Sequence, residues 1–184
     1  MARLTILHLS DLHLSTAEFK NQEVVLQALW RDLKRLREAG QKVDMVFFTG
    51  DLVCKGEYLP ETPQNVKNAF ISPLLAETLL PVERLFICPG NHDLDLTSRS
   101  PLLKPIINSV NSQDSLTSFL SEFSTNAPLQ TGFEKFNSLL QEIGHAKPEI
   151  HTHFYRGYLE QINGLTISIC VLNSGSSWKR VGKS

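Results

Sequence analysis

The chain has few cysteines and no apolar run long enough to span a membrane. Its three cysteines, Cys54, Cys88 and Cys170, are far apart and form no C-x-x-C pair. An odd, scattered set is typical of a reducing compartment rather than of a disulfide framework. No segment approaches the roughly 20 apolar residues of a membrane helix, and the first residues lack the apolar core of a signal peptide. We therefore expect a cytoplasmic protein without a membrane association.

Charge of neither sign dominates. The formal net charge is −1 and the pI is about 6.6, so the sequence gives no strong nucleic-acid signal. With 41% hydrophobic residues over 184 positions, the chain can bury one ordinary core. We expect Cys88 and Cys170, which lie in apolar segments, to be small buried hydrophobic residues.

Three short apolar runs stand out, at residues 4–9, 45–49 and 85–88. Polar strings follow them in chain order: Asp11-Leu12-His13, Gly50-Asp51 and Gly90-Asn91-His92-Asp93. Short apolar runs with polar or Gly/Pro boundaries predict buried parallel strands. Ligands in open α/β sheets collect outside the carboxyl ends of the strands, and oxygen and imidazole donors brought together there can bind divalent cations. The pattern therefore predicts a metal site, with two ions.

Helical periodicity connects the predicted strands. Apolar residues between positions 26 and 36 recur at helical spacing and Gly40 offers a stop. A second helix is expected from about residue 63 to residue 80, kinked or divided at Pro73. Further helices are expected over residues 115–123, inside an irregular insertion at 97–127, and over residues 133–143, where Gly144 is a cap.

The C-terminal part predicts a β-hairpin. Strand-like runs at residues 154–162 and 165–172 flank Asn163-Gly164, a strong two-residue turn signal. The fold class is therefore α/β, with a mostly parallel sheet flanked by helices and a C-terminal hairpin. On the first strand, side-chain alternation places Thr5, Leu7 and Leu9 on one face and His8 with Ile6 on the other. We expect His8 to be a partly buried, hydrogen-bonded histidine.

The three strings together resemble the early motifs of the calcineurin-like metallophosphoesterases, which read D-x-H, G-D and G-N-H-D/E. The resemblance is good over residues 4–93 and loose over the hairpin. It implies that the chain is the first part of that family's αββα sandwich. It also implies that residues 1–184 form one such domain, incomplete at its C-terminus.

The resemblance implies a role for each site residue. Asp11 and His13 would hold a first metal, Asp51 would bridge two metals and Asn91 would bind the second. A bridging carboxylate offsets the repulsion between cations about 3.5–4 Å apart. His92 would act at the leaving group rather than as a ligand. Mixed oxygen and nitrogen donors suit Mn, Fe or Zn better than Ca.

The segment after Asp51 departs from one branch of the family. Protein Ser/Thr phosphatases read G-D-x-V-D-R-G, whereas this chain has Cys54 and Lys55 where that pattern has Asp and Arg. Cysteine cannot hold an imidazolium as a carboxylate does, and lysine is a point charge without the bidentate geometry of arginine. This departure favours phosphodiesterase-like or nuclease-like members. Lys55 could contact substrate phosphate or be a solvated surface residue.

The family also needs three later histidines, two of them in a G-H-x-H string. His145, His151 and His153 match in number, but no glycine precedes His151 and the lead-in differs. We expect His145 to lie in a surface loop and the missing ligands to lie beyond Ser184, where further domains could also follow. The tail, residues 181–184, resembles a phosphate-binding loop, but its glycine spacing is wrong and no helix follows.

The function predicted from the resemblance is metal-dependent hydrolysis of a phosphoester, on phosphodiesters rather than phosphoproteins. Without the later ligands, this chain by itself is expected to bind metal weakly and could be inactive. The alternative is a non-catalytic scaffold of the same fold, as in the family's retromer subunit, although drifted ligand positions are typical of that member. Substrate, metal identity and oligomeric state stay open.

Overall fold

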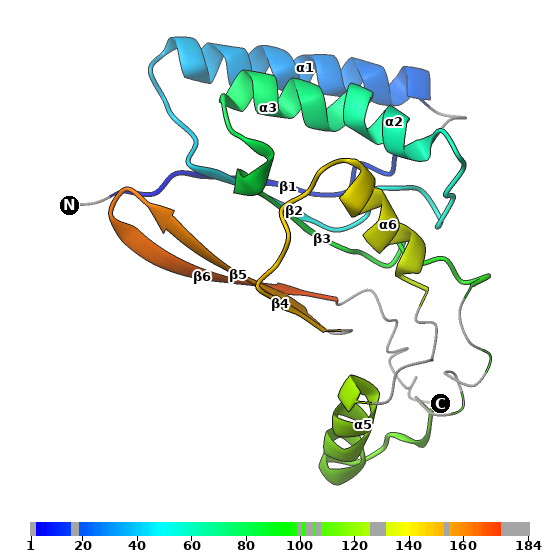
Figure 1. The fold of residues 1–184 in the computed structure, drawn as a ribbon. Helices are drawn as coiled ribbons and strands as arrows, with labels where there is room; N and C mark the ends of the chain where they lie inside the picture. Colours follow the sequence, from blue (N-terminus) through cyan, green and yellow to red (C-terminus); the bar gives the residue numbers. More distant parts are fainter. Residues whose placement is uncertain are drawn as a thin grey trace.

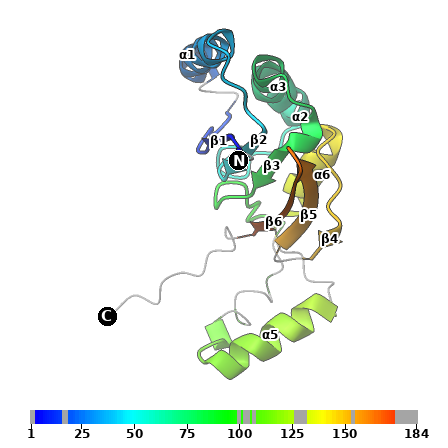
Figure 2. The same cartoon turned by 90° about the vertical axis from the view of Figure 1, so that its left-hand side faces the viewer.

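The structure is a computed structural model that describes residues 3–15, 19–98, 101, 105, 108–125, 132–152 and 155–173. Two three-stranded sheets lie against each other, and helices cover the outer face of the first sheet (Figures 1 and 2). This arrangement confirms the α/β fold class predicted from the sequence. No helix in these ranges is long and apolar enough to cross a membrane.

The first sheet is parallel and has the strand order β1-β2-β3. Its strands are β1 (Ile6–Leu9), β2 (Met45–Thr49) and β3 (Leu85–Cys88). All three coincide with or lie inside the predicted apolar runs. Parallel pairing brings the three carboxyl ends to one edge of the sheet, because Leu9 aligns with Phe48 and Thr49 aligns with Cys88.

Helices pack on one face of this sheet (Figure 1). They are α1 (Phe19–Glu38), α2 (Thr62–Val66), the π-helix η1 (Lys67–Ile71) and α3 (Ser72–Thr78), with a 3-10 turn η2 (Val82–Arg84) before β3. Helix α6 (Glu134–Glu142) joins the same core through Phe136 and Leu139. Helix α5 (Gln113–Thr125) lies apart from the layers in both views (Figure 2).

Pro73 divides the second helical segment, as predicted, but does so through a π-turn. The Ser72 amide donates to the Lys67 carbonyl, five residues earlier. A proline lacks the amide that an α-helix would pair with the carbonyl four residues before it, and its ring clashes with that carbonyl. The π-turn comes directly before α3, which has Pro73 in its first turn, so the helical path continues past the proline.

The second sheet is antiparallel, with the order β4-β5-β6. Its strands are β4 (Ile150–His151), β5 (Tyr155–Ile162) and β6 (Leu165–Leu172). Asn163 and Gly164 have φ of 51° and 77°, as a type I′ turn requires, so the hairpin is confirmed. A second core lies between the sheets, and its largest members are Met45, Phe86 and Tyr158.

Two predictions of burial on the strands were wrong. Cys170 is exposed, because alternation along β6 places Ile169 and Val171 on the inner face and Cys170 on the outer one. His8 is also exposed, on an edge strand that the hairpin sheet does not cover, although its Nε2 lies 2.6 Å from the Thr49 hydroxyl as a hydrogen-bonded histidine should. Cys88 is partly buried.

Candidate metal centre

The loops after β1 and β2 run side by side beyond the sheet. The amide of Asp11 donates to the Gly50 carbonyl at 3.0 Å, and the amide of His13 donates to the Asp51 carbonyl at 2.8 Å. A parallel bridge between Leu14 and Val53 extends the pairing further. Backbone pairing therefore places the D-x-H string next to the G-D string.

Three of the predicted ligands have strained backbones. Asp11, His13 and Asp51 have φ of 59°, 48° and 60°, a region that costs a non-glycine residue about 1–3 kcal/mol. Such strain persists only where the surrounding structure enforces it, and it is concentrated at functional sites. The left-handed turns redirect these side chains at the carboxyl edge of the sheet.

The side chains of these loops converge. His13 Nε2 lies 3.7 Å from Asp11 Oδ1 and 3.8 Å from Asp51 Oδ2. His13, Asp51 and His92 each offer one donor atom, and these three atoms lie within 4.8 Å of one another. The imidazole rings of His13 and His92 meet edge to face with centroids 4.6 Å apart. Asp11 and Asp51 are therefore on the same side of the sheet, as predicted.

Exposure increases outward through this group. The Asp51 side chain is 14% exposed, that of His13 is 35% exposed and that of Asp11 is 65% exposed. Asp51 therefore forms the floor, whereas Asp11 lies at the solvent rim. A buried carboxylate at the centre of a site open on one side can hold an ion that substrate can still reach.

The donor set fits a divalent metal ion. The separations of His13 from Asp11 and Asp51 are too long for hydrogen bonds, yet two ligands each about 2.1 Å from one ion would be roughly 3–4 Å apart. His92 Nδ1 is buried and has no hydrogen-bond partner in the described part of the chain. Such an orphaned nitrogen in a group of possible metal ligands is expected where a further group completes the site.

Two glycines allow the β2 and β3 loops to approach. A Cβ on Gly90 would overlap the Asp51 carboxylate and lie 2.5 Å from its amide, and one on Gly50 would lie 3.0 Å from Gly90 Cα. Gly50 also has φ of 109°, which L side chains rarely adopt. The glycines of the G-D and G-N-H strings are therefore needed for close packing of the two loops.

Asp93 joins the same two loops from beneath. Its side chain is fully buried, its Oδ1 accepts from the Val53 amide at 2.9 Å and its Oδ2 accepts from the Gly90 amide at 2.8 Å. Burial raises the pKa of the Asp93 carboxyl, while hydrogen bonds from these amides act in the opposite direction. Sequence reasoning gave Asp93 no role, although its place in the G-N-H-D string was a usable signal.

Gln22 and Tyr58 were also missed by the sequence analysis. The Gln22 side-chain amide donates to the carbonyls of Leu12 and His13 and accepts from the Ser15 amide at 3.3 Å. It therefore ties helix α1 to the loop that carries His13. The Tyr58 hydroxyl donates to the Asp93 carbonyl at 2.7 Å. Neither residue belongs to a motif, so no sequence signal could have found them.

The remaining predicted residues lie at the edge of this group. Asn91 is exposed in the β3 loop, one residue before His92. Lys55 is exposed in a turn with φ of 53°, and the next residue, Gly56, donates its amide to the His92 carbonyl at 2.6 Å. The Lys55 backbone is thus next to the His92 loop, while its side chain makes no ion pair with a described residue.

The three later histidines are not part of the group as far as the structure describes them. His145 lies beside the backbone of Leu85, at the amino end of β3, whereas the metal group follows the carboxyl end. His151 is exposed on β4. Neither joins the cluster of His13, Asp51 and His92. His153 and the tail at 181–184 lie outside the described residues.

His145 is not the surface loop residue that the sequence predicted. It packs edge-on against Tyr158, with ring centroids 6.0 Å apart. Burial, together with the charge of Arg156, lowers the pKa of His145 to about 4. The residue therefore belongs to the packing between β3 and β5 and is neutral near pH 7.

A family model for calcineurin-like phosphoesterases matches residues 4–168. The chain belongs to this family. A search of curated proteins found no match. Membership indicates metal-dependent phosphoester hydrolysis, and the group of His13, Asp51 and His92 offers the metal-binding side chains that this chemistry needs.

Proposed function

We propose that this chain is a phosphodiesterase-like or nuclease-like hydrolase that uses two divalent metal ions. In this proposal Asp11 and His13 hold the first ion, Asn91 holds the second, and the Asp51 carboxylate is shared between them. The observation that supports it is the convergence of side chains on His13, whose Nε2 lies 3.7 Å from Asp11 Oδ1 and 3.8 Å from Asp51 Oδ2, with a donor atom of His92 within 4.8 Å of His13 and Asp51. Mn, Fe or Zn is the ion expected for this donor set.

When bound, the ions would lower the pKa of a coordinated water and neutralise charge on the phosphoryl oxygens. Asp51 is suited to the central position because its two oxygens are used differently. Oδ1 accepts from the His92 amide at 2.8 Å, which leaves Oδ2, 3.8 Å from His13 Nε2, to face the other side chains of the group. The hydrogen bond fixes the carboxylate before any ion arrives, so little rotamer entropy remains to be lost on binding.

His92 is the proposed acid at the leaving group. Its ring meets the His13 ring edge to face, and its backbone is fixed at both ends, by Asp51 and by the Gly56 amide. A protonated imidazole can transfer its proton to an alkoxide as it departs. Lys55 is the proposed contact to substrate phosphate, because it stands where the protein phosphatase pattern has an arginine.

The proposed preference for phosphodiesters depends on the presence of Lys55 where the protein phosphatase pattern has an arginine. A bidentate arginine would grip the terminal oxygens of a monoester, which carries more charge. A single lysine at the rim matches the lower charge of a diester. A leaving-group acid is needed in both cases, so the discrimination comes from the phosphate contact.

The test compares hydrolysis of bis-p-nitrophenyl phosphate and p-nitrophenyl phosphate with added Mn²⁺, in wild-type protein and in His92→Ala. The matched control is His151→Ala, which alters an exposed histidine outside the group. We expect the diester to be preferred, and turnover to fall about 10²–10⁴-fold in His92→Ala only. Saturable Mn²⁺ binding without hydrolysis of either ester would instead support the non-catalytic scaffold, or show that the chain needs the later ligands for activity.

A further inference from the structure

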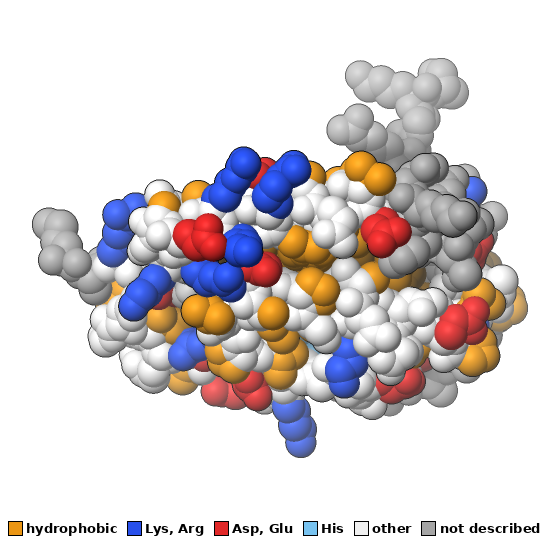
Figure 3. All heavy atoms as spheres, turned by 90° about the horizontal axis from the view of Figure 1, so that it is seen from above, with side chains coloured by type: hydrophobic (Ala, Val, Ile, Leu, Met, Phe, Trp, Pro, Cys, Tyr) orange, Lys and Arg blue, Asp and Glu red, His pale blue; other side chains and the backbone are white. Residues whose placement is uncertain are grey.

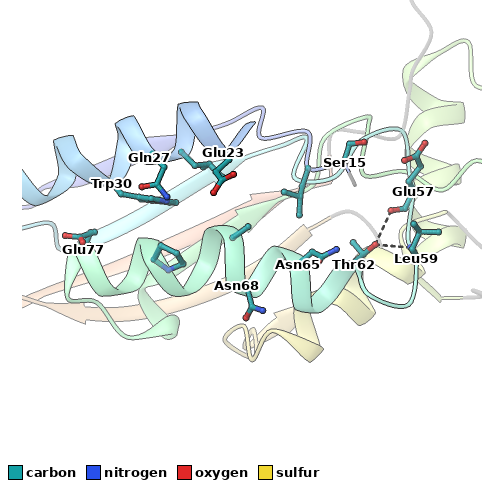
Figure 4. Close-up of a pocket in the computed structure, with 14 residues that line it drawn as sticks. Ser15, Glu23, Gln27, Trp30, Glu57, Leu59, Thr62, Asn65, Asn68 and Glu77 are labelled. Atoms are coloured by element: carbon teal, nitrogen blue, oxygen red, sulfur yellow. Dashed lines mark hydrogen bonds between the residues drawn. The ribbon is translucent and has the colours of Figure 1, made fainter. Parts of the chain in front are cut away.

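A wedge-shaped pocket separates α1 from α2, on the helix side of the first sheet. Its volume is about 700 Å³, within the size range of small-molecule sites. Figure 4 shows Glu23, Gln27 and Trp30 extending from α1 toward α2 and α3. None of the proposed metal-site residues lines this wedge pocket, so it is a separate feature.

Helices α1 and α3 are joined at one end of the wedge pocket. Arg37 of α1 pairs with Glu77 of α3 at 3.0 Å and donates to the Ala76 carbonyl at 3.2 Å. At the other end the Thr62 hydroxyl accepts from the Leu59 amide at 2.9 Å, which fixes the loop before α2 as a wall. The pocket therefore lies between an ion-paired end and a hydrogen-bonded loop, on defined secondary structure.

The floor of the wedge pocket is apolar and aromatic. It is formed by Leu14, Leu26, Trp30, Ala69 and Pro73. Leu14 and Leu26 are both 6% exposed, so they form a packed base. The Trp30 ring contacts Phe70 with centroids 6.0 Å apart. Such a floor favours a ligand with an apolar body, and an indole ring also attracts cations.

The rim is acidic. Glu23 and Glu57 line the pocket, both are exposed, and neither forms an ion pair with a described residue. No described lysine or arginine lines the pocket, and Arg37 beside it is occupied by Glu77. Seen from above, basic side chains gather at one end of the helix face and hydrophobic side chains are visible between them and the opposite end (Figure 3).

We propose that the wedge pocket binds an organic cation with an apolar body. The floor contributes hydrophobic contact and cation–π attraction from Trp30, and the two free carboxylates contribute charge complementarity at the rim. The side-chain amide of Asn65 at the wall adds a polar partner without adding charge. The site is independent of the metal centre and does not depend on the proposed activity.

A matched pair of probes tests this. Tetraphenylphosphonium and tetraphenylborate have nearly the same shape and opposite charge. The sequence has only two tryptophans, Trp30 and Trp178, so in a Trp178→Phe background Trp30 fluorescence reports on the wedge pocket directly, with titration calorimetry as a second readout. We expect the phosphonium to quench Trp30 in a saturable manner and the borate to do so at least tenfold more weakly.

Charge variants then identify the site. Glu23→Gln with Glu57→Gln should weaken phosphonium binding about tenfold, since each exposed carboxylate contributes up to about 1 kcal/mol. Glu38→Gln, an exposed α1 residue at the joined end, is the matched control and should leave binding unchanged. Equal or tighter binding of the borate, no binding of the phosphonium, or no effect of the double variant would overturn the proposal.

Discussion

Asp51 Oδ1 accepts a hydrogen bond from the backbone amide of His92 at 2.8 Å. The acid that follows β2 is thereby fixed by the loop that follows β3. Asp93 does the reverse, since it follows β3 and accepts from the Val53 amide in the β2 loop at 2.9 Å. Two reciprocal carboxylate–amide bonds thus hold the proposed metal site together from both sides.

Asp93→Asn tests the buried half of this arrangement. An asparagine can accept one amide hydrogen bond but presents its own NH₂ to the other amide, so one buried donor loses its partner. We expect the free energy of unfolding in urea to fall by about 1–3 kcal/mol. We also expect Mn²⁺ affinity to fall about 10–100-fold, because the ligand-bearing loops lose their alignment.

Asp114→Asn, the same chemical change at an exposed position of α5, is the control and should alter neither quantity. A variant of Asp93 with unchanged metal affinity and lowered stability would show that the residue supports the fold without positioning the site.

Gly90→Ala tests the close approach of the two loops. A Cβ at Gly90 overlaps the Asp51 carboxylate, so we expect a stability loss of about 1–3 kcal/mol together with weakened Mn²⁺ binding. Gly40→Ala is the comparison, because Gly40 has φ of 77° and open space around it. That change should cost about 1 kcal/mol from backbone strain alone and leave metal binding intact. Calorimetric titration of Mn²⁺ into both variants distinguishes the two effects, because only a change in site geometry weakens metal binding.

His145 gives a pH prediction. Its folded pKa of about 4 is below the usual 6.5, so between these values the unfolded chain binds a proton that the folded chain does not. Stability should therefore rise with pH across this window, and its contribution should be lost as the pH falls from 6.5 toward 4. After a discount for partial exposure, we expect about 1–2 kcal/mol. Urea unfolding at pH 4.5 and 7 should show that the rise of the unfolding free energy with pH is smaller in His145→Gln than in wild type. An unchanged rise would mean that other groups cause the pH dependence.

Much of the fold could be predicted from sequence because its signals are local. The runs at residues 45–49 and 85–88 are the strands themselves, and Asn163-Gly164 specifies its own turn. Burial that depends on residues far away in the sequence was harder to predict. His145 was expected at the surface because it follows a helix cap, whereas a neighbour 13 residues later, Tyr158, encloses it.

The site was predicted in part for the same reason. Motifs gave Asp11, His13, Asp51 and His92, which the structure brings together. The residues that position them could not be inferred from spacing. Gln22 reaches the His13 loop from α1, and this contact depends on how the helix packs on the sheet. Asp93 was visible in its motif, but one of its two amide partners, Val53, lies 40 residues away in the chain.

The most direct test of the account is calorimetric titration of Mn²⁺ into wild-type protein, Asp51→Asn and Asp114→Asn at pH 7. Asp51 forms the buried floor of the group, so its loss should remove a shared ligand and weaken binding by more than about 100-fold, beyond the range typical of positioning residues. Asp114→Asn should match the wild type. Saturable binding to wild type that disappears in Asp51→Asn is the predicted result. Equal binding by all three proteins, or none by wild type at millimolar Mn²⁺, would contradict a metal centre at these loops.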